Sequence, residues 1–231
     1  MPELFGRRND ASRIATADSV VVIGLGRFGR AVALELIDSD TEVLGIDADE
    51  AIVQELSTEL THVVRADSTV EDALRQLAVP EFDRAVVAIG TNIEASLLTA
   101  SLLRKLGVRN IWAKAISDAH GRILGELGIT HVVYPEHEMG RRVAHLVRGR
   151  MLDFIQFEPD YAMVKTEPPA FLLGVPLGQS GVRRKHGITV VGVKRPGKTF
   201  GHATGETVLE SGDMIIVSGL PRDVEVFSEL R

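Results

Sequence analysis

The sequence predicts an α/β protein in which a doubly wound parallel sheet is followed by one longer helix and a small α+β lobe. Three observations lead to this prediction. Short β-branched segments alternate with helical segments over residues 19–134, the first segment runs into a glycine-rich turn, and prolines and further β-rich segments follow residue 158. Such alternation is typical of parallel βαβ units whose sheet is covered on both faces.

The elements of the first domain are expected in a regular order. Apolar, β-branched runs predict strands over residues 20–23, 42–47, 62–67, 85–90, 110–114 and 131–134. Helices are expected between these strands, over residues 31–37, 50–60, 70–77, 94–106 and 121–127. After the sixth strand, apolar residues at helical spacing predict a single helix over residues 139–152.

The C-terminal part has a different pattern. Prolines between residues 159 and 176 divide it into short pieces, and β-rich runs predict strands over residues 188–194 and 214–219, with a helix over 222–230. We therefore expect a first domain over residues 18–136, a helix and linker over 137–157, and a separate lobe over 158–231.

Composition and charge exclude several classes of protein. The chain has 231 residues, of which 45% are hydrophobic and 25% charged, as in ordinary globular proteins. No apolar run approaches the ~20 residues of a membrane-spanning helix, and residues 1–18 lack the apolar core of a secretory signal. A net charge of −6 argues against a nucleic-acid-binding protein, and the absence of cysteine is consistent with a reducing cytosol.

The first expected strand leads into a turn that is typical of nucleotide-binding proteins. Gly24, Gly26 and Gly29 form a GxGxxG pattern, in which the glycines permit a tight turn, close approach of a pyrophosphate, and close helix–strand packing. Asp47 ends the second strand, where an acid usually binds ribose hydroxyls and disfavours a 2′-phosphate. The pattern predicts a nucleotide with a free ribose rather than NADP; the alternative is a structural turn beside a solvated aspartate.

Other polar residues near the expected strand ends have two interpretations each. Arg27 lies inside the turn, where it either binds phosphate oxygens as a fork or is a surface arginine. Asp67 and Ser68 lie at the end of the third strand, either as crevice residues or as a helix N-cap. Lys114 ends the fifth strand, either as a phosphate ligand or as a solvated charge at the sheet's edge.

The sequence offers no catalytic residues for hydride transfer. We find no plausible acid–base pair in the first domain: Tyr134 has no lysine four residues later, and the Tyr-x-x-x-Lys spacing of Tyr161 and Lys165 falls in the C-terminal part of the chain. A nucleotide site without such groups predicts a sensor and not an enzyme. The nucleotide would shift the sensor between conformations because it binds them with different affinities. The alternatives are a small NAD-dependent oxidoreductase and a redox-sensing transcription factor, which would need a basic recognition helix.

Several stretches together resemble the KTN/RCK family of TrkA-type regulators of potassium transport, most of all its Ktr-type gating subunits. These stretches are residues 22–29, 86–92, 110–115, 134–140, 173–177, 187–195 and 210–217. The resemblance extends over residues 18–230. It implies a Rossmann-like TrkA-N domain, a crossover helix matching residues 139–152, and a TrkA-C lobe.

The same resemblance implies a non-enzymatic, nucleotide-gated ring. Members of the family form homodimers through the crossover helix, and the dimers assemble into an octameric ring on the cytoplasmic side of the cell membrane, beneath a membrane-embedded potassium channel subunit. ATP and ADP, or in some relatives NAD or NADH, bind in the crevice of the first domain. The bound nucleotide sets alternative ring shapes and thereby the ion flux.

Matching residues to the family's motifs gives a set of expected nucleotide-binding residues. The set is Gly24, Gly26, Arg27, Phe28, Gly29, Asp47, Ala66, Asp67, Ser68, Gly90, Asn92, Lys114 and Glu136. Arg27 matches an arginine that contacts phosphates across the dimer, and Lys114 matches a phosphate-side lysine. Residues 66–68 depart from the Asn-Ala-Thr more common in the family, so the adenine or ribose contacts there are expected to differ.

Two further ligands are implied by the resemblance. Glu136 matches a carboxylate near the phosphates, where Mg²⁺ or Ca²⁺ would bridge the like charges; the alternative is an acid that only caps the crossover helix. Some relatives bind cyclic di-AMP in the C-terminal lobe, where Val182, Arg183 and Arg184 provide apolar and cationic side chains. The alternative there is a solvated basic turn.

Overall fold

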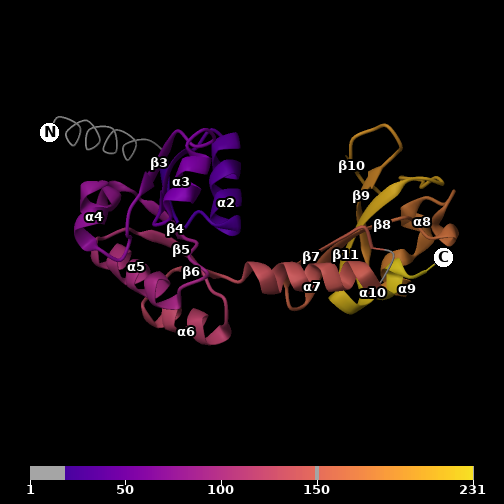
Figure 1. Cartoon of the computed structure of the whole chain (residues 1–231). Helices are drawn as coiled ribbons and strands as arrows, with labels where there is room; N and C mark the ends of the chain where they lie inside the picture. Colours follow the sequence, from indigo (N-terminus) through magenta and orange to yellow (C-terminus); the bar gives the residue numbers. More distant parts are fainter. Residues whose placement is uncertain (1–18, 149–150, 231) are drawn as a thin grey trace. The chain divides into compact units, whose positions relative to one another are not determined.

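The computed structural model describes residues 19–148 and 151–230, and the chain divides into two compact units, residues 1–136 and 137–231 (Figure 1). Each unit has its own sheet and its own apolar core. Residues 1–18, where the sequence predicts no secretory signal, lie outside the described residues. Within the described ranges, no helix is long and apolar enough to cross a membrane.

The first unit is built on a six-stranded parallel sheet with the order β3-β2-β1-β4-β5-β6. Its strands are β1 (Ser19–Ile23), β2 (Glu42–Asp47), β3 (His62–Arg65), β4 (Arg84–Val87), β5 (Asn110–Lys114) and β6 (His131–Val133). The chain starts in the middle, builds outward to β3, and then returns to build the other half from β4. This order confirms the predicted doubly wound fold and creates a crevice at the carboxyl ends of β1 and β4.

Helices cover both faces of this sheet (Figure 1). They are α2 (Arg27–Asp38), α3 (Glu50–Leu56), α4 (Glu71–Gln76), α5 (Ile93–Lys105) and α6 (Asp118–Glu126), with a 3₁₀ turn at Val79–Glu81. Val20 and Val22 of β1 belong to an apolar cluster with α2 and α3, whereas Val21 and Ile23 belong to a second cluster with α4, α5 and α6. Because successive side chains of a strand point to opposite faces, the continuous valine run of β1 is buried on both sides.

The second unit contains a five-stranded antiparallel sheet with the order β10-β9-β11-β8-β7. Its strands are β7 (Asp153–Glu158), β8 (Tyr161–Thr166), β9 (Thr189–Lys194), β10 (Gly201–His202) and β11 (Met214–Gly219). Its helices are α7 (Pro135–Arg148), which begins at the end of the first unit, α8 (Leu177–Ser180), α9 (Val182–His186) and α10 (Pro221–Ser228), with a 3₁₀ turn at Ala170–Leu172. A single apolar cluster that includes Phe154, Ile215 and Phe227 forms its core. The small α+β lobe predicted for this region is confirmed.

Several boundaries differ from the sequence expectation. The helix expected over 139–152 is α7, which begins at Pro135, because proline is well tolerated in a first helical turn. The strands expected to end at residues 67 and 90 end earlier, at Arg65 and Val87. Residues expected in the linker form β7, which pairs with β8 as a hairpin and places Phe154 in the core of the lobe.

Candidate nucleotide-binding site

The glycine turn between β1 and α2 has a backbone that only glycine accommodates. Gly24 has φ +89°, and a Cβ there would lie 3.0 Å from the backbone of Ala88 and Ile89, the residues that follow the neighbouring strand β4. A Cβ on Gly29 would lie 1.8 Å from the carbonyl oxygen of Gly24. The first and third glycines of the motif are therefore required by packing, as the sequence predicts.

The second glycine leaves the N-terminus of α2 open. Gly26 is the N-cap of this 12-residue helix, no side chain caps the helix, and its first turn contains no acidic residue. A Cβ on Gly26 would meet no atom within 4 Å. The first amides of a helix lack partners and its N-terminal end is electropositive, so this position suits a phosphate that approaches the backbone closely.

A pocket of about 430 Å³ opens beside this turn, at the switch point of the sheet. Segments that follow four strands of the sheet surround it, at the carboxyl ends where open α/β sheets bind ligands. Of the expected binding residues, the pocket is lined by Gly24, Gly26, Asp47, Ala66, Asp67, Ser68, Gly90 and Asn92. Asp49, Ile52 and Thr91 also line it, and the sequence reasoning missed them. Asp49 and Thr91 follow predicted strands closely, which is the pattern that points to them, whereas Ile52 lies in α3.

Asp47 has a second role that the sequence did not indicate. Its Oδ2 accepts a hydrogen bond from the amide of Leu25 at 2.6 Å, and its Oδ1 accepts one from the amide of Asp49 at 2.9 Å. The carboxylate therefore ties the glycine turn to the end of β2. A carboxylate has about four acceptor positions, so each oxygen retains capacity for a ribose hydroxyl.

The residues after β3 have local hydrogen bonds that set their orientation. Asp67 Oδ1 accepts hydrogen bonds from the amide and the hydroxyl of Thr69 at 2.9 and 2.7 Å, which lower the pKa of the Asp67 carboxyl. Ser68 is buried, and its hydroxyl lies 2.8 Å from that of Thr99. The N-cap of α4 is Val70, so the alternative that Asp67 or Ser68 caps this helix is wrong.

The segment after β4 forms the opposite wall of the pocket. Asn92 is the N-cap of α5, and its side-chain oxygen accepts a hydrogen bond from the amide of Ala95 at 3.0 Å. Gly90 lies beside Lys114, since a Cβ on this glycine would be 3.4 Å from the lysine ammonium. Gly90 thus separates the pocket from a buried positive charge.

Lys114 is not a solvated lysine at the sheet's edge, because it is only 9% exposed. Its Nζ lies 2.5 Å from Glu136 Oε1 and 5.6 Å from the centre of the Phe28 ring. The hydrogen bond from Lys114 lowers the pKa of Glu136, and the charge of Arg27 contributes in the same direction. Arg27 itself is exposed at the start of α2. Phe28, Arg27, Lys114 and Glu136 therefore form one cluster beside the glycine turn.

A metal site is not evident among the residues that the structure describes. No group of three or more histidine, aspartate or glutamate side chains is placed to hold a metal ion there. Glu136, the one residue expected to bind a divalent ion, has Lys114 as its partner. A divalent ion at this position would therefore need phosphate oxygens as additional ligands.

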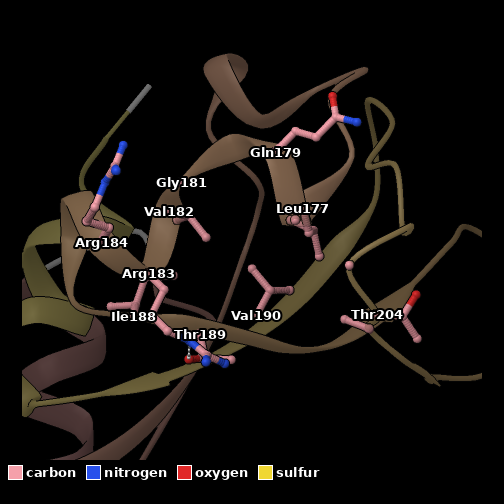
Figure 2. Close-up of a pocket in the computed structure, with 13 residues that line it drawn as sticks. Leu177, Gln179, Gly181, Val182, Arg183, Arg184, Ile188, Thr189, Val190 and Thr204 are labelled. Carbon is pink, nitrogen blue, oxygen red and sulfur yellow. Dashed lines mark hydrogen bonds between the residues drawn. The ribbon is translucent and has the colours of Figure 1, made fainter.

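The C-terminal lobe contains a second pocket, of about 680 Å³, lined by residues of α8, α9 and β9 and by residues 203–205 (Figure 2). Val182, Arg183 and Arg184, which the sequence analysis selected, all line it. They lie in the short helix α9, where Val182 is buried and Arg183 and Arg184 are exposed. Figure 2 shows the side chains of Leu177, Val182 and Val190 directed toward the middle of the pocket.

Comparison with known proteins covers both units. The TrkA-N domain family matches residues 20–135, and the TrkA-C domain family matches residues 161–231. Ktr system potassium uptake protein C of Bacillus subtilis is 36% identical over 209 residues, which cover 90% of this chain and 95% of that protein. Ktr system potassium uptake protein A of Vibrio alginolyticus is 35% identical over 203 residues, which cover 87% of this chain and 92% of that protein.

Solved structures show the same fold at lower sequence identity. The GsuK RCK domain matches with a TM-score of 0.65 at 18% identity, over 92% of this chain and 48% of that chain. This chain therefore spans about half of the GsuK chain. A GsuK channel bound to NAD matches with a TM-score of 0.64 at 18% identity, over 90% of this chain and 38% of that one.

Proposed function

Because the chain belongs to the TrkA-N/TrkA-C family and is similar to Ktr system potassium uptake proteins over most of their length, we propose that it is a regulatory subunit of a potassium channel or transporter that senses nucleotides. It would act on the cytoplasmic side of the cell membrane, held there by its membrane-embedded partner. Binding of ATP or ADP would favour different arrangements of the assembly and so control ion flux.

The observation that carries this proposal is the open N-terminus of α2 at the mouth of a nucleotide-sized pocket. No side chain caps α2, the first turn of this helix contains no acidic residue, and Gly26 leaves space for a phosphate. Asp47 lines the same pocket and retains acceptor capacity for ribose hydroxyls. Its negative charge would repel the 2′-phosphate of NADP.

These features do not separate ATP and ADP from NAD and NADH, because all of them have an adenosine with free ribose hydroxyls. We propose ATP and ADP as the ligands, because the chain resembles the Ktr-type gating subunits and is 35–36% identical to two Ktr proteins over most of their length. A divalent ion such as Mg²⁺ or Ca²⁺ between Glu136 and the terminal phosphate is a further part of this proposal, with the phosphate oxygens completing its ligands.

A regulatory role is also consistent with the hydrogen bonds of the polar side chains that line the pocket. The polar side chains that line it accept hydrogen bonds from backbone amides; they are those of Asp47, Asp49, Asp67 and Asn92. None of them forms an acid–base pair with a histidine, lysine or tyrosine among the described residues. An oxidoreductase, the alternative, would need such a group beside the nicotinamide.

Assembly is the next part of the proposal. Met139, Val143 and Val147 lie four residues apart on α7, with exposed fractions of 54%, 46% and 80%. Residues at this spacing form one stripe along a helix. We propose that a second copy of the chain covers this stripe, giving a homodimer through the crossover helix, and that dimers form an octameric ring.

The C-terminal pocket supports a second ligand site. It combines apolar side chains with two arginines, and Arg183 Nε donates a hydrogen bond to Thr189 Oγ1 at 3.0 Å (Figure 2). A cyclic dinucleotide offers flat bases and two phosphates, which suit such a surface. We propose cyclic di-AMP as its ligand.

Thermal unfolding with added ligands tests the nucleotide proposal. A ligand that binds only the folded state raises the unfolding midpoint by mass action. ATP and ADP should raise the unfolding midpoint at lower concentrations than NADP does. A titration with NADH tests whether this alternative ligand also binds. If none of the four changes the midpoint, or if NADP acts at the lowest concentration, the proposed nucleotide function is wrong.

A further inference from the structure

The antiparallel sheet of the second unit has one buried and one accessible face. Residues along β8 alternate between these faces, and the buried ones belong to the apolar core of the lobe. Met163 and Lys165 lie on the accessible face, with Ile155 opposite the first and Ile216 opposite the second. The accessible face is therefore apolar in its middle, whereas the solvated face of an antiparallel sheet is normally polar. An apolar patch of this kind marks an interaction surface.

Phe200 extends this face into the hairpin of β9 and β10, which protrudes from the lobe (Figure 1). Phe200 is 41% exposed. Gly192 leaves room for its ring, because a Cβ on this glycine would lie 3.8 Å from Phe200 and from Ile216. The ammonium groups of Lys165 and Lys194 lie 6.0 and 5.8 Å from the centre of the ring. The face thus ends in an exposed aromatic ring beside two positive charges.

The loop of this hairpin adds a third positive charge. Residues 195–200 contain Arg195, Lys198 and no acid. Arg195 is paired with Glu210 at 3.3 Å, whereas Lys198 is exposed. Lys198 is therefore the cation that the loop contributes to this end of the face.

Acidic side chains of the same sheet do not cancel these charges. Asp153, which lies opposite Lys165 in the register, is paired with Arg142 at 2.6 Å. Glu158 and Asp160 belong to the turn between β7 and β8, at the opposite end of β8 from Lys165. The face therefore has a positive end, an apolar middle and an acidic end.

The two units also differ in net charge. Residues 137–231 contain 13 lysines and arginines and 11 acids, whereas residues 1–136 contain 13 and 21. The chain's net charge of −6 therefore comes from the first unit. An acidic chain with one basic part has the charge distribution expected when that part meets an anionic surface.

We propose that the positive end of this face docks on an anionic lipid bilayer. This end consists of Phe200, Lys165, Lys194 and Lys198. The ring enters the boundary between headgroups and acyl chains, while the lysine ammonium groups bind lipid phosphates. This inference goes beyond the proposed function, which holds the chain at the membrane through its partner alone.

A bilayer accounts for this surface better than a second copy of the chain does. A symmetric contact through Phe200 would place the lysines of one copy against those of the other, and like charges repel. An anionic bilayer offers an apolar layer and negative charge at the same place. It therefore matches both the exposed ring and the lysines around it.

Sedimentation with vesicles tests the contact. The full chain should bind vesicles of phosphatidylcholine mixed with phosphatidylglycerol, and it should not bind vesicles of phosphatidylcholine alone. The attraction between lysines and an anionic bilayer is screened by salt, so binding should weaken as the concentration of sodium chloride rises.

Single substitutions locate the docking surface. Lys194→Gln should weaken vesicle binding about fivefold and Phe200→Ser about tenfold, because one lysine at the bilayer surface and one inserted ring contribute affinity of that order. Two matched controls should leave binding unchanged. They are Lys185→Gln, at an exposed lysine of α9, and Phe157→Ser, at an exposed ring near the acidic end of the same face. Thermal unfolding of each variant checks that the fold is retained.

A tryptophan at the docking position gives an independent measurement. The chain has one tryptophan, Trp112, which belongs to the first unit. The fluorescence of Phe200→Trp should shift to shorter wavelength with anionic vesicles and should be quenched by brominated lipids, because the ring at this position enters an apolar layer. The wild-type chain should show neither change.

Three results would overturn the inference. The first is no binding to anionic vesicles. The second is vesicle binding that Lys185→Gln weakens as much as Lys194→Gln does, or that leaves Phe200→Trp unquenched, since the contact would then lie on another surface. The third is a smaller assembly of Phe200→Ser in light scattering together with no lipid binding, which would assign the surface to a second copy. None of these results affects the nucleotide proposal, because the titrations that test it contain no lipid.

Discussion

Replacement of Gly26 by alanine should strongly weaken nucleotide binding without unfolding the protein. Gly26 has φ −63° and ψ −172°, a conformation that alanine adopts without strain, and no atom lies within 4 Å of the position of the new methyl group. The methyl group would instead project where a phosphate must approach the amides of α2. The Gly26→Ala variant should therefore exclude the phosphate sterically while it leaves the fold intact.

The magnitudes follow from the same geometry. Alanine is a poorer N-cap than glycine, so stability should fall by at most about 1 kcal/mol, or about 2–4 °C in the unfolding midpoint. A charge-assisted hydrogen bond contributes about 1.5–3 kcal/mol, so losing one between phosphate and backbone should weaken ATP binding by about 10- to 100-fold.

Two matched glycine variants complete this experiment. Gly29→Ala places a Cβ 1.8 Å from the Gly24 carbonyl oxygen, so it should destabilise the first unit more than Gly26→Ala does. Gly125→Ala lies on α6, where a Cβ meets nothing within 4 Å, and should stabilise the chain by about 0.5–1 kcal/mol. Calorimetric titration and thermal unfolding of all three are the assays. If Gly26→Ala binds ATP as tightly as the wild-type chain, the phosphates do not lie at the N-terminus of α2.

Three further predictions concern other parts of the molecule. Asp47→Asn should lower stability by about 1–2 kcal/mol, because the asparagine side chain has only one oxygen and loses one of the two hydrogen bonds from the backbone amides of Leu25 and Asp49. An unchanged unfolding midpoint would contradict this prediction. Burial lowers the pKa of His120, whose Nε2 has no hydrogen-bond partner in the described part of the chain. The unfolded chain then binds a proton more readily, so stability should fall as pH drops below ~6.5, and His120→Gln should reduce that pH dependence in unfolding measurements. Arg183→Ala should weaken cyclic di-AMP binding at least about tenfold in calorimetric titrations, and equal binding would place that ligand elsewhere.

Much of the first unit was determined by the sequence alone, because local patterns specify local structure. The valine run of β1 can be buried only between two layers of helices, and no other residue type fits at Gly24 and Gly29. Asp47 was identified as a pocket residue because the end of the second strand in this fold always faces the crevice.

Sequence patterns were less informative in the second unit. Strand β7 was assigned largely to the linker and β8 was not predicted as a strand, because the alternation of this hairpin is clear only when both strands are compared. Phe154 lies opposite Val164 in the register of this hairpin, and both are buried. A strand at the edge of an antiparallel sheet is specified in part by side chains of its partner strand. A sequence window along one strand does not contain those partner residues.

Only the tertiary structure decided the partners of the charged residues. From the sequence, Lys114 had two interpretations and Glu136 was expected near phosphates or a metal ion. The parallel pairing of β5 with β6 places Lys114 opposite Val133, and the chain then turns into α7, which brings Glu136 back to the lysine. The electrostatic energy of an ion pair depends on distance and burial, and neither quantity is encoded in the spacing of two residues along the chain.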